Sequence, residues 1–186
     1  MVVGKAHGGY IILDVYGLNK KINIKVLLIV VMVLCLIFFK AFAMDKIIVR
    51  GNSMCDSYRD GDVIWVKKGF FMSLLERCDV VVIHTRHGGD IIKRIVGLPL
   101  ETVLIFEGEI FVDGEKLSLD GIDYIKDAGI AESEVRLKEN QYFVIGDNVN
   151  DSVDSRSPEI GVIESQEIIG KPFYRFLPFS RIGRVD

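Results

Sequence analysis

The most apolar part of the chain lies near its N-terminus. Residues 26–39 carry no charged side chain, and beyond Lys40 residues 41–44 continue the apolar stretch. Together, residues 26–44 reach the roughly 20 residues that a membrane-spanning helix needs, and the long Lys40 side chain can extend its amine to the interface. The pattern therefore predicts a transmembrane anchor over residues 26–44, with an N-terminal tail over residues 1–25.

A cleavable signal is the competing interpretation of the same run. Residues 41–43, Ala-Phe-Ala, have the small-x-small form of a cleavage site, whereas the preceding residues 1–25 are long for the front of a signal. The run follows four lysines, so the positive-inside rule favours a cytoplasmic N-terminus. These lysines are Lys5, Lys20, Lys21 and Lys25. We favour the retained single-pass anchor, which places residues 45–186 outside the cytoplasmic membrane.

After the anchor, short apolar runs alternate with turns. The best hairpin signal is residues 80–96, where two strand-like runs flank Arg-His-Gly-Gly-Asp, because glycine supplies the positive φ that a tight turn requires. Residues 118–140 are more polar and lack a clear period, which favours an insertion or long loop. The predicted strands are 46–50, 63–66, 80–84, 91–96, 110–112, 142–145 and 168–176. The expected fold is mainly β: an antiparallel β domain preceded by one N-terminal transmembrane helix.

Composition narrows the classes of function. The net charge of −3 gives no basic surface for nucleic acid. The histidines, His7, His84 and His87, are scattered and form no spacing typical of a metal site, so neither a metal nor another cofactor is predicted. Outside the predicted anchor, Cys55 and Cys78 could form a disulfide or remain as two thiols. We favour the two thiols.

Two residues offer candidate catalytic chemistry. A serine hydroxyl such as that of Ser53 is a weak nucleophile until a base removes its proton, and no histidine is suitably placed. Lys93 is the remaining candidate base, although at the reference pKa only about one lysine in 2,500 is neutral at pH 7. Strand alternation puts Lys93 on one face with Ile91 and Ile95, and such an apolar face lowers a lysine pKa.

Taken with a polar turn at residues 146–156, these segments resemble the type I signal (leader) peptidases. The resemblance rests on Ser53-Met54, on residues 61–64 (Gly-Asp-Val-Ile), on residues 93–99 (Lys-Arg-Ile-Val-Gly-Leu-Pro) and on Gly-Asp-Asn at 146–148 followed by Ser-x-Asp-Ser-Arg at 152–156. It covers residues 45–186 and implies a membrane-anchored serine endopeptidase. Ser53 would attack the carbonyl at the end of a signal sequence and Lys93 would act as general base, in a Ser/Lys dyad with an acyl-enzyme intermediate.

The resemblance also implies supporting roles and partners. Ser152 would hold the Lys93 amine, Asp154 and Arg156 would form a structural ion pair, and Asp147 would support the same turn. The Ser53 N–H would help stabilise the oxyanion. The substrates would be preproteins with small-x-small cleavage sites, bound as an added strand beside the active-site edge. The lipid bilayer would contact an apolar surface, supplied either by residues 70–72 or by Phe173, Tyr174, Phe176 and Phe179.

Three positions depart from the family pattern. Asp56 stands where proline is usual, Gly51 stands where some relatives carry an oxyanion-hole serine, and Leu100 replaces a glycine. These departures keep two alternatives open. One is a specialised maturation peptidase of a conjugative or secretion system, and the other is a catalytically idle signal-sequence-binding domain. The sequence favours a bacterial inner membrane and does not fix the oligomeric state.

Overall fold

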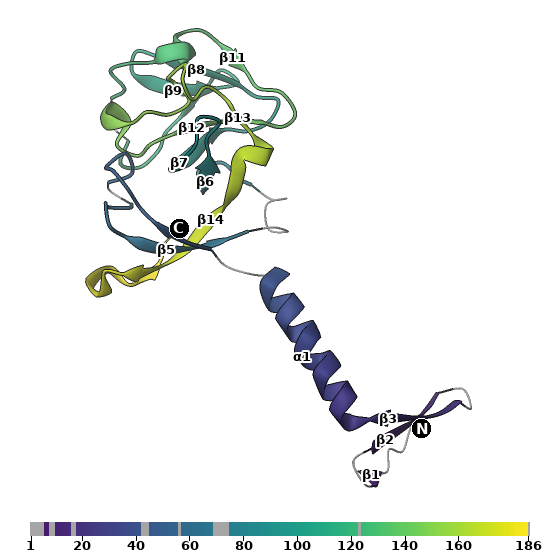
Figure 1. Cartoon of the computed structure of the whole chain (residues 1–186). Coiled ribbons are helices and arrows are strands. Elements are labelled where there is room, and N and C mark those ends of the chain that lie inside the picture. The colour runs from purple at the N-terminus through teal and green to yellow at the C-terminus, as the bar shows by residue number, and fades with distance from the viewer. Residues whose placement is uncertain are drawn as a thin grey trace. The chain divides into compact units, whose positions relative to one another are not determined.

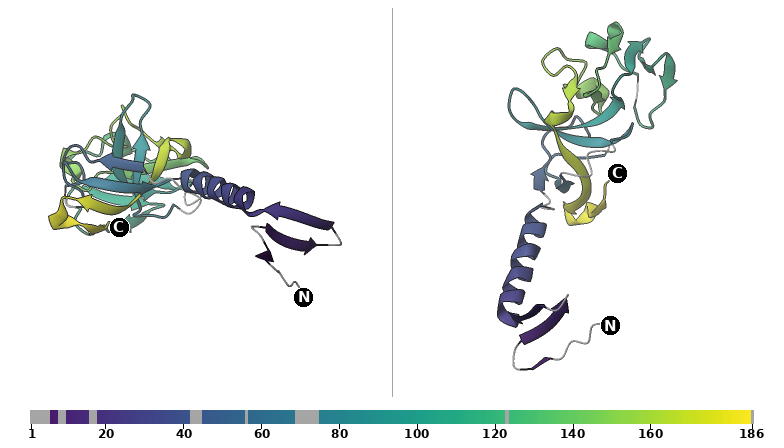
Figure 2. Two further views of the ribbon diagram at one scale, coloured as in Figure 1. Left: turned by 60° about the horizontal axis from the view of Figure 1, so that its bottom comes forward. Right: turned by 90° about the vertical axis from the view of Figure 1, so that its right-hand side faces the viewer.

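The structure is a computed structural model, and it forms two compact units, Met1–Ala43 and Met44–Asp186. It describes residues 6–7, 10–15, 18–41, 45–55, 57–68, 75–122 and 124–185. Side chains are described for residues 23–36 and, within those ranges, from residue 45 onward. Figures 1 and 2 show the elements of each unit.

The first unit combines a small sheet with a helix. Strands β1 (Ala6–His7), β2 (Tyr10–Val15) and β3 (Leu18–Asn23) pair antiparallel, and α1 (Ile24–Ala41) follows. These strands lie within residues 1–25, the N-terminal tail predicted from the sequence, for which no strands were specified. No helix in the described residues is both long enough and apolar enough to cross a membrane. Residues 42–44, the end of the predicted anchor, lie outside the described residues.

The second unit is built on two antiparallel sheets. The large sheet has the order β13-β12-β7-β6-β14-β5-β4, with β15 paired to β14, and the small sheet has the order β10-β9-β8-β11. Figure 1 shows the small sheet at one end of this unit and β5 at the other. The strands are β4 (Asp45–Ile48), β5 (Val63–Lys67), β6 (Val80–His84), β7 (Asp90–Gly97), β8 (Thr102–Phe106), β9 (Glu109–Val112), β10 (Glu115–Leu117), β11 (Val135–Arg136), β12 (Gln141–Ile145), β13 (Ile163–Glu164), β14 (Ile168–Leu177) and β15 (Gly183–Arg184). The predicted antiparallel β domain is confirmed.

The small sheet differs most from the sequence-based prediction. Glu107-Gly108 and Asp113-Gly114 all have positive φ, as a two-residue type I′ turn requires, so β9 pairs with both β8 and β10. The sequence analysis missed β8. The stretch 118–140, predicted to be a loop, contains the 3₁₀-helix Gly129–Glu132 and β11, which pairs with β8. A strand as short as β11 leaves no periodic signal in the sequence.

Strand β7 lies at the centre of the core. Its residues Ile92, Ile95 and Val96 each pack in a different apolar cluster, and none is more than 9% exposed. The register pairs Lys93 with Val81, which packs in one cluster with Ile91 and Ile95. Lys93 therefore has the apolar surroundings that strand alternation predicted.

The long strand β14 connects the two ends of the large sheet. It pairs with β6 near its start and with β5 along the rest of its length, register shifts interrupt both pairings, and the strand curves along its course (Figure 2). The 3₁₀-helix Phe179–Arg181 and β15 follow it. This course brings the C-terminal arginines of the chain close to the turn after β4, where Ser53 lies.

Candidate active site

Ser53 and Lys93 form a hydrogen-bonded pair in the second unit. Ser53 lies in the turn that follows β4, and Lys93 projects from the middle of β7. The Lys93 Nζ donates to the Ser53 Oγ over 2.6 Å. Ser53 is half-buried, whereas Lys93 is only 3% exposed. The distance is within the range required for proton transfer between a nucleophile and its base.

Burial lowers the pKa of Lys93 toward the range that a general base requires. Desolvation lowers the pKa of Lys93 to about 8, with a smaller lowering from Arg156 and opposing contributions from Asp154 and Asp147. At pH 7 this makes about one lysine in ten neutral, against about one in 2,500 at the unperturbed value. The amine can therefore accept a proton at neutral pH.

The turn after β12 is organised around Asp154, which is fully buried. The two carboxylate oxygens of Asp154 accept from the Arg156 guanidinium at 2.8 and 2.9 Å, and they also accept from the Gly146 N–H and the Ser152 hydroxyl. A buried charge pair needs such additional hydrogen bonds to offset its desolvation. The Asp154–Arg156 ion pair predicted from the resemblance is present.

Ser152 lies beside the dyad with its hydroxyl directed at Asp154. The Oγ donates to Asp154 Oδ2 over 2.7 Å, and no hydrogen bond joins Ser152 to Lys93 within the described part of the chain. A hydroxyl has one donor and two acceptor lone pairs. Donation to Asp154 therefore leaves Ser152 able to accept from a Lys93 ammonium, and its predicted role stays a prediction.

Asp147 belongs to a network that the sequence analysis did not identify. Arg94 binds its two carboxylate oxygens at 2.7 and 2.8 Å, and the Ser57 hydroxyl donates to it over 2.6 Å. The hydrogen bond to Asp147 is the main cause that raises the pKa of Arg94. Arg94 directly follows Lys93 on β7. This position next to the candidate base is the feature of the sequence that could have indicated a role for Arg94 in the site.

Hydrogen bonds and a close backbone approach connect the Ser53 turn to residues 146–148. The Asn148 N–H donates to the Ser53 carbonyl over 3.0 Å, and the Asp147 N–H donates to the Met54 sulfur over 3.3 Å. A Cβ at Gly146 would lie 2.5 Å from the Ser53 carbonyl oxygen and 2.3 Å from the Ser152 Oγ. Glycine at 146 is therefore what lets the two turns approach this closely.

The positions that depart from the family pattern have different structural contexts. Gly51 has φ +82° and Leu100 has φ +72°, both in the left-handed region that favours glycine. A serine at position 51 would be strained there, and Leu100 carries this strain already. Asp56 and residues 70–72 lie outside the described residues. Cys55 and Cys78 form no disulfide in the part of the chain that the structure describes.

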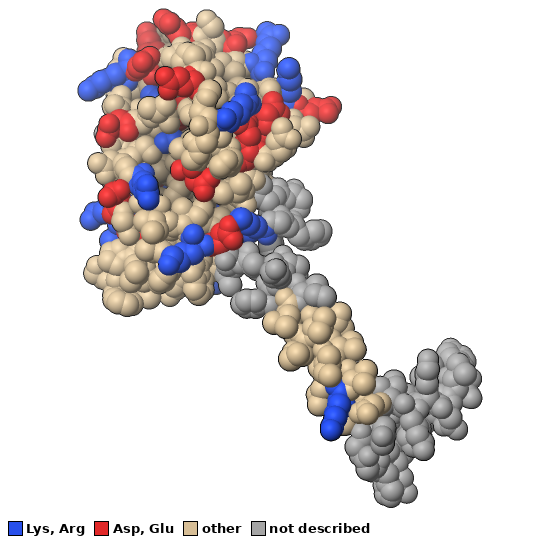
Figure 3. Space-filling view, in the orientation of Figure 1, with Lys and Arg blue, Asp and Glu red and all other residues tan. Residues whose placement is uncertain are grey.

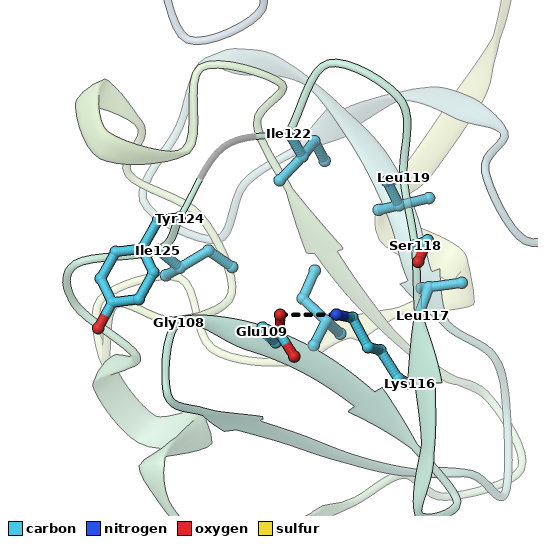
Figure 4. Close-up of a pocket in the computed structure, with 10 residues that line it drawn as sticks. Gly108, Glu109, Lys116, Leu117, Ser118, Leu119, Ile122, Tyr124 and Ile125 are labelled. Atoms are coloured by element: carbon cyan, nitrogen blue, oxygen red, sulfur yellow. Dashed lines mark hydrogen bonds and ion pairs between the residues drawn. The ribbon is translucent and has the colours of Figure 1, made fainter.

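A narrow cleft opens beside Ser53. Its volume is about 60 Å³, and it lies between residues 47–51, at the end of β4, and residues 90–92, at the start of β7. A larger cavity of about 280 Å³ lies in the small sheet, where Glu109 and Lys116 form an ion pair near Tyr124 (Figure 4). None of the predicted site residues lines that cavity. Nor do three His, Cys, Asp or Glu side chains come together as metal ligands anywhere in the described ranges.

Comparison of the amino-acid sequence with known proteins finds similarity to signal peptidases. The family model described as "Signal peptidase, peptidase S26" matches residues 22–177. Signal peptidase I of Bacillus licheniformis is 29% identical over 85% of this chain and 90% of its own length. Signal peptidase I U of Bacillus subtilis (strain 168) is 30% identical over 88% of this chain and 92% of its own. The crystal structure of a signal peptidase I from Enterococcus faecalis V583 covers 53% of this chain and 96% of its own, with 25% identity and a TM-score of 0.44.

Proposed function

Because the chain belongs to the signal peptidase family, peptidase S26, and is a serine endopeptidase, we propose that it removes N-terminal signal sequences from exported proteins through a Ser53/Lys93 dyad. The observation that carries this proposal is the 2.6 Å contact between Ser53 Oγ and a lysine amine that is almost fully buried. A surface lysine would remain charged and would not serve as a base.

Acylation is the first half of the proposed reaction. Neutral Lys93 takes the Ser53 proton as Oγ forms a bond to the scissile carbonyl carbon. The carbonyl oxygen becomes an oxyanion, and the Ser53 N–H, which pairs with no acceptor among the described residues, is one donor available to it. The Lys93 ammonium then gives its proton to the leaving nitrogen as the peptide bond breaks. The mature protein leaves with a free amino group, and the signal remains as an ester on Ser53.

Deacylation uses the same groups in reverse. Lys93, neutral again, takes a proton from water, and the hydroxide attacks the ester carbonyl. The ester bond breaks, Lys93 returns the proton to Ser53 Oγ, and the signal leaves with a carboxyl group. In this proposal Ser152 accepts from the Lys93 ammonium in each half, while its own hydroxyl donates to Asp154, which pairs with Arg156.

The cleft favours small side chains. The cleft is small, about 60 Å³, and its walls include Ile48, Ile91 and Ile92, which suits a small apolar side chain next to Ser53. Strand β4, which forms one wall, ends the order of the large sheet, so its free edge can pair with an extended peptide. A preprotein that ends its signal in Ala-x-Ala fits both constraints.

Membrane attachment is the remaining part of the proposal. Residues 26–44 are the proposed anchor, and in α1 the large apolar side chains from Val26 to Leu36 other than Leu27 are 44–63% exposed. In the second unit, Trp65 on β5 packs on three aromatic residues of β14, with Lys46 and Lys67 beside the rings. Those aromatic residues are Phe173, Tyr174 and Phe176. Around the end of β14 the surface of this unit is largely uncharged (Figure 3), and the lysines near β5 border it, an arrangement that suits an apolar face at a membrane interface.

The test of this function is cleavage of a preprotein whose signal ends in Ala-x-Ala, with the full chain in detergent. We expect the wild type to cut after the second alanine and Ser53→Ala to be inactive. Ser133→Ala, a change at an exposed serine, should match the wild type. A wild type that cleaves none of several such preproteins would contradict the proposal, and binding of the preprotein without cleavage would favour a signal-sequence-binding domain.

A further inference from the structure

We propose that Ser57 is a positioning residue for the nucleophile, held through its hydroxyl by one ion-pair network and through its carbonyl by a second. This inference rests on the proposed dyad and adds a residue four positions after Ser53. Ser57 belongs to the same turn as the nucleophile: its N–H donates to the Met54 carbonyl over 3.0 Å, and the Tyr58 N–H donates to the same oxygen.

The first network connects Ser57 to the strand that carries Lys93. The Ser57 hydroxyl donates to Asp147 Oδ2 over 2.6 Å, and Arg94 contacts both Asp147 and, over 3.3 Å, the Ser57 Oγ. The Asp147 side chain is 7% exposed and that of Arg94 is 18% exposed, so solvent screens these contacts only weakly. Because Arg94 follows Lys93 on β7, this network connects the two halves of the dyad independently of the Ser53–Lys93 bond.

The second network reaches the same residue from the C-terminal part of the unit. Arg175 on β14 donates to the Ser57 carbonyl over 2.5 Å, and Arg181 donates to it over 3.4 Å. Both guanidiniums pair with Asp62, whose side chain is 1% exposed, at 2.9 and 3.1 Å. Asp62 also accepts from the Arg59 N–H. A single carboxylate thus orients two arginines toward one carbonyl oxygen.

Ser57 is therefore the residue at which both networks meet. Side chains held by charge-assisted hydrogen bonds have little freedom, and a nucleophile must stay within a few tenths of an ångström of its productive position. Loss of the Ser57 hydroxyl leaves the carbonyl contacts in place but removes the bond between the turn and the Asp147 carboxylate. The consequence expected is a lower rate of the chemical step with little change in substrate binding.

The experiment measures kcat, KM and the unfolding midpoint for the full-length wild type and for Ser57→Ala, Ser57→Thr and Ser133→Ala, with Ser53→Ala as the inactive reference. We expect Ser57→Ala to lower kcat by about tenfold or more at nearly unchanged KM. Ser57→Thr, which keeps the hydroxyl, should stay within about threefold of the wild type. Ser133→Ala should have no effect. Ser57→Cys, whose thiol is a weaker donor of similar size, should have a kcat between those of Ser57→Ala and Ser57→Thr. This variant tests the inference if Ser57→Ala folds poorly.

Three results would overturn the inference: a Ser57→Ala kcat equal to that of the wild type, a Ser57→Thr variant as impaired as Ser57→Ala, or a change confined to KM. The wild type in the same assay separates this failure from failure of the proposed function. Cleavage by the wild type with no effect at Ser57 removes only the positioning role, whereas an inert wild type removes the function itself.

Discussion

At the scale of single residues, the site depends on a lysine placed where its charge is disfavoured. Lys93 is 3% exposed, and desolvation is the main cause that lowers its pKa to about 8. A shift of this size costs the folded state about 3 kcal/mol at neutral pH, since each pKa unit corresponds to about 1.4 kcal/mol. The fold therefore gives up stability to hold beside Ser53 an amine that loses its proton more readily than an ordinary lysine.

Replacement of Lys93 by methionine should stabilise the protein. Below pH 8 the folded state carries a charged, buried amine, and its full desolvation penalty lowers the free energy of unfolding. This penalty shrinks as the pH rises above 8 and is gone above the unfolded-state pKa of about 10.4. Lys93→Met should therefore raise the free energy of unfolding by about 2–3 kcal/mol at pH 7 and by almost nothing near pH 10.5. Denaturant unfolding at both pH values checks this, with the exposed Lys138→Met as control. An equal gain at both pH values would contradict the assigned cause.

Leu100 offers a separate test of residue-scale strain. It has φ +72° and is 71% exposed, so its side chain gains little from packing while its Cβ is strained. Leu100→Gly should raise the free energy of unfolding by about 1 kcal/mol and the midpoint by about 2–4 °C. Leu100→Ala keeps the Cβ and should show no gain. Equal midpoints for the glycine and alanine variants would mean that the strain is absent.

At the scale of elements, the site forms where the turn after β12 meets the turn that carries Ser53. Sequence reasoning located both turns, as well as most strands of the large sheet, because their apolar runs and glycine turns are local signals. It missed β8 and β11, the latter because its pairing with β8 depends on contacts distant in sequence. It also missed Ser57 and Arg175, which meet across 118 positions in the chain. Hydrogen-bond partners of this kind are set by packing and leave no pattern along the sequence.

The close approach of these two turns predicts a severe effect of a single methyl group. Gly146→Ala would place a Cβ 2.3 Å from the Ser152 Oγ and 2.5 Å from the Ser53 carbonyl, so both must shift. We expect kcat to fall by about a hundredfold. Gly170→Ala is the matched control, because its Cβ would lie 2.3 Å from the Lys67 carbonyl, between β14 and β5.

The control should lower stability while leaving kcat within a few-fold of the wild type. Measuring kcat and the unfolding midpoint for both variants separates damage to the dyad from damage to the sheet. A Gly146→Ala variant with wild-type kcat would show that the turns are not held as closely as the structure indicates.

At the scale of the whole molecule, the chain consists of a sheet and helix unit followed by the catalytic unit. The division between these units falls at residues 43 and 44. The proposed anchor lies in the first unit, and the proposed lipid-facing aromatic residues lie on β5 and β14 of the second. Two such proposed contacts would suit the proposed preprotein substrates, whose apolar signals would also bind the bilayer.

The anchor predicts firm membrane association of the full chain. The wild type should stay in the membrane pellet through high-salt and alkaline washes and should be released by detergent. Val31→Asp combined with Leu34→Asp should release it, because each acidic residue near the centre of a spanning helix costs about 2.5–3.5 kcal/mol. Val31→Leu combined with Leu34→Val should behave like the wild type. Release of the wild type by the alkaline wash would contradict a spanning anchor.

The dyad itself is tested most directly by the pH dependence of kcat/KM between pH 6 and 10, measured with an uncharged signal-sequence peptide. If neutral Lys93 is the base, kcat/KM should rise about tenfold per pH unit and level off near pH 8, following the pKa of about 8 of the free enzyme. Lys93→Met should remove the activity, and Lys138→Met should reproduce the wild-type profile. A profile that levels off near pH 6.5, or a Lys93→Met variant that still cleaves, would contradict the assignment of Lys93 as the general base.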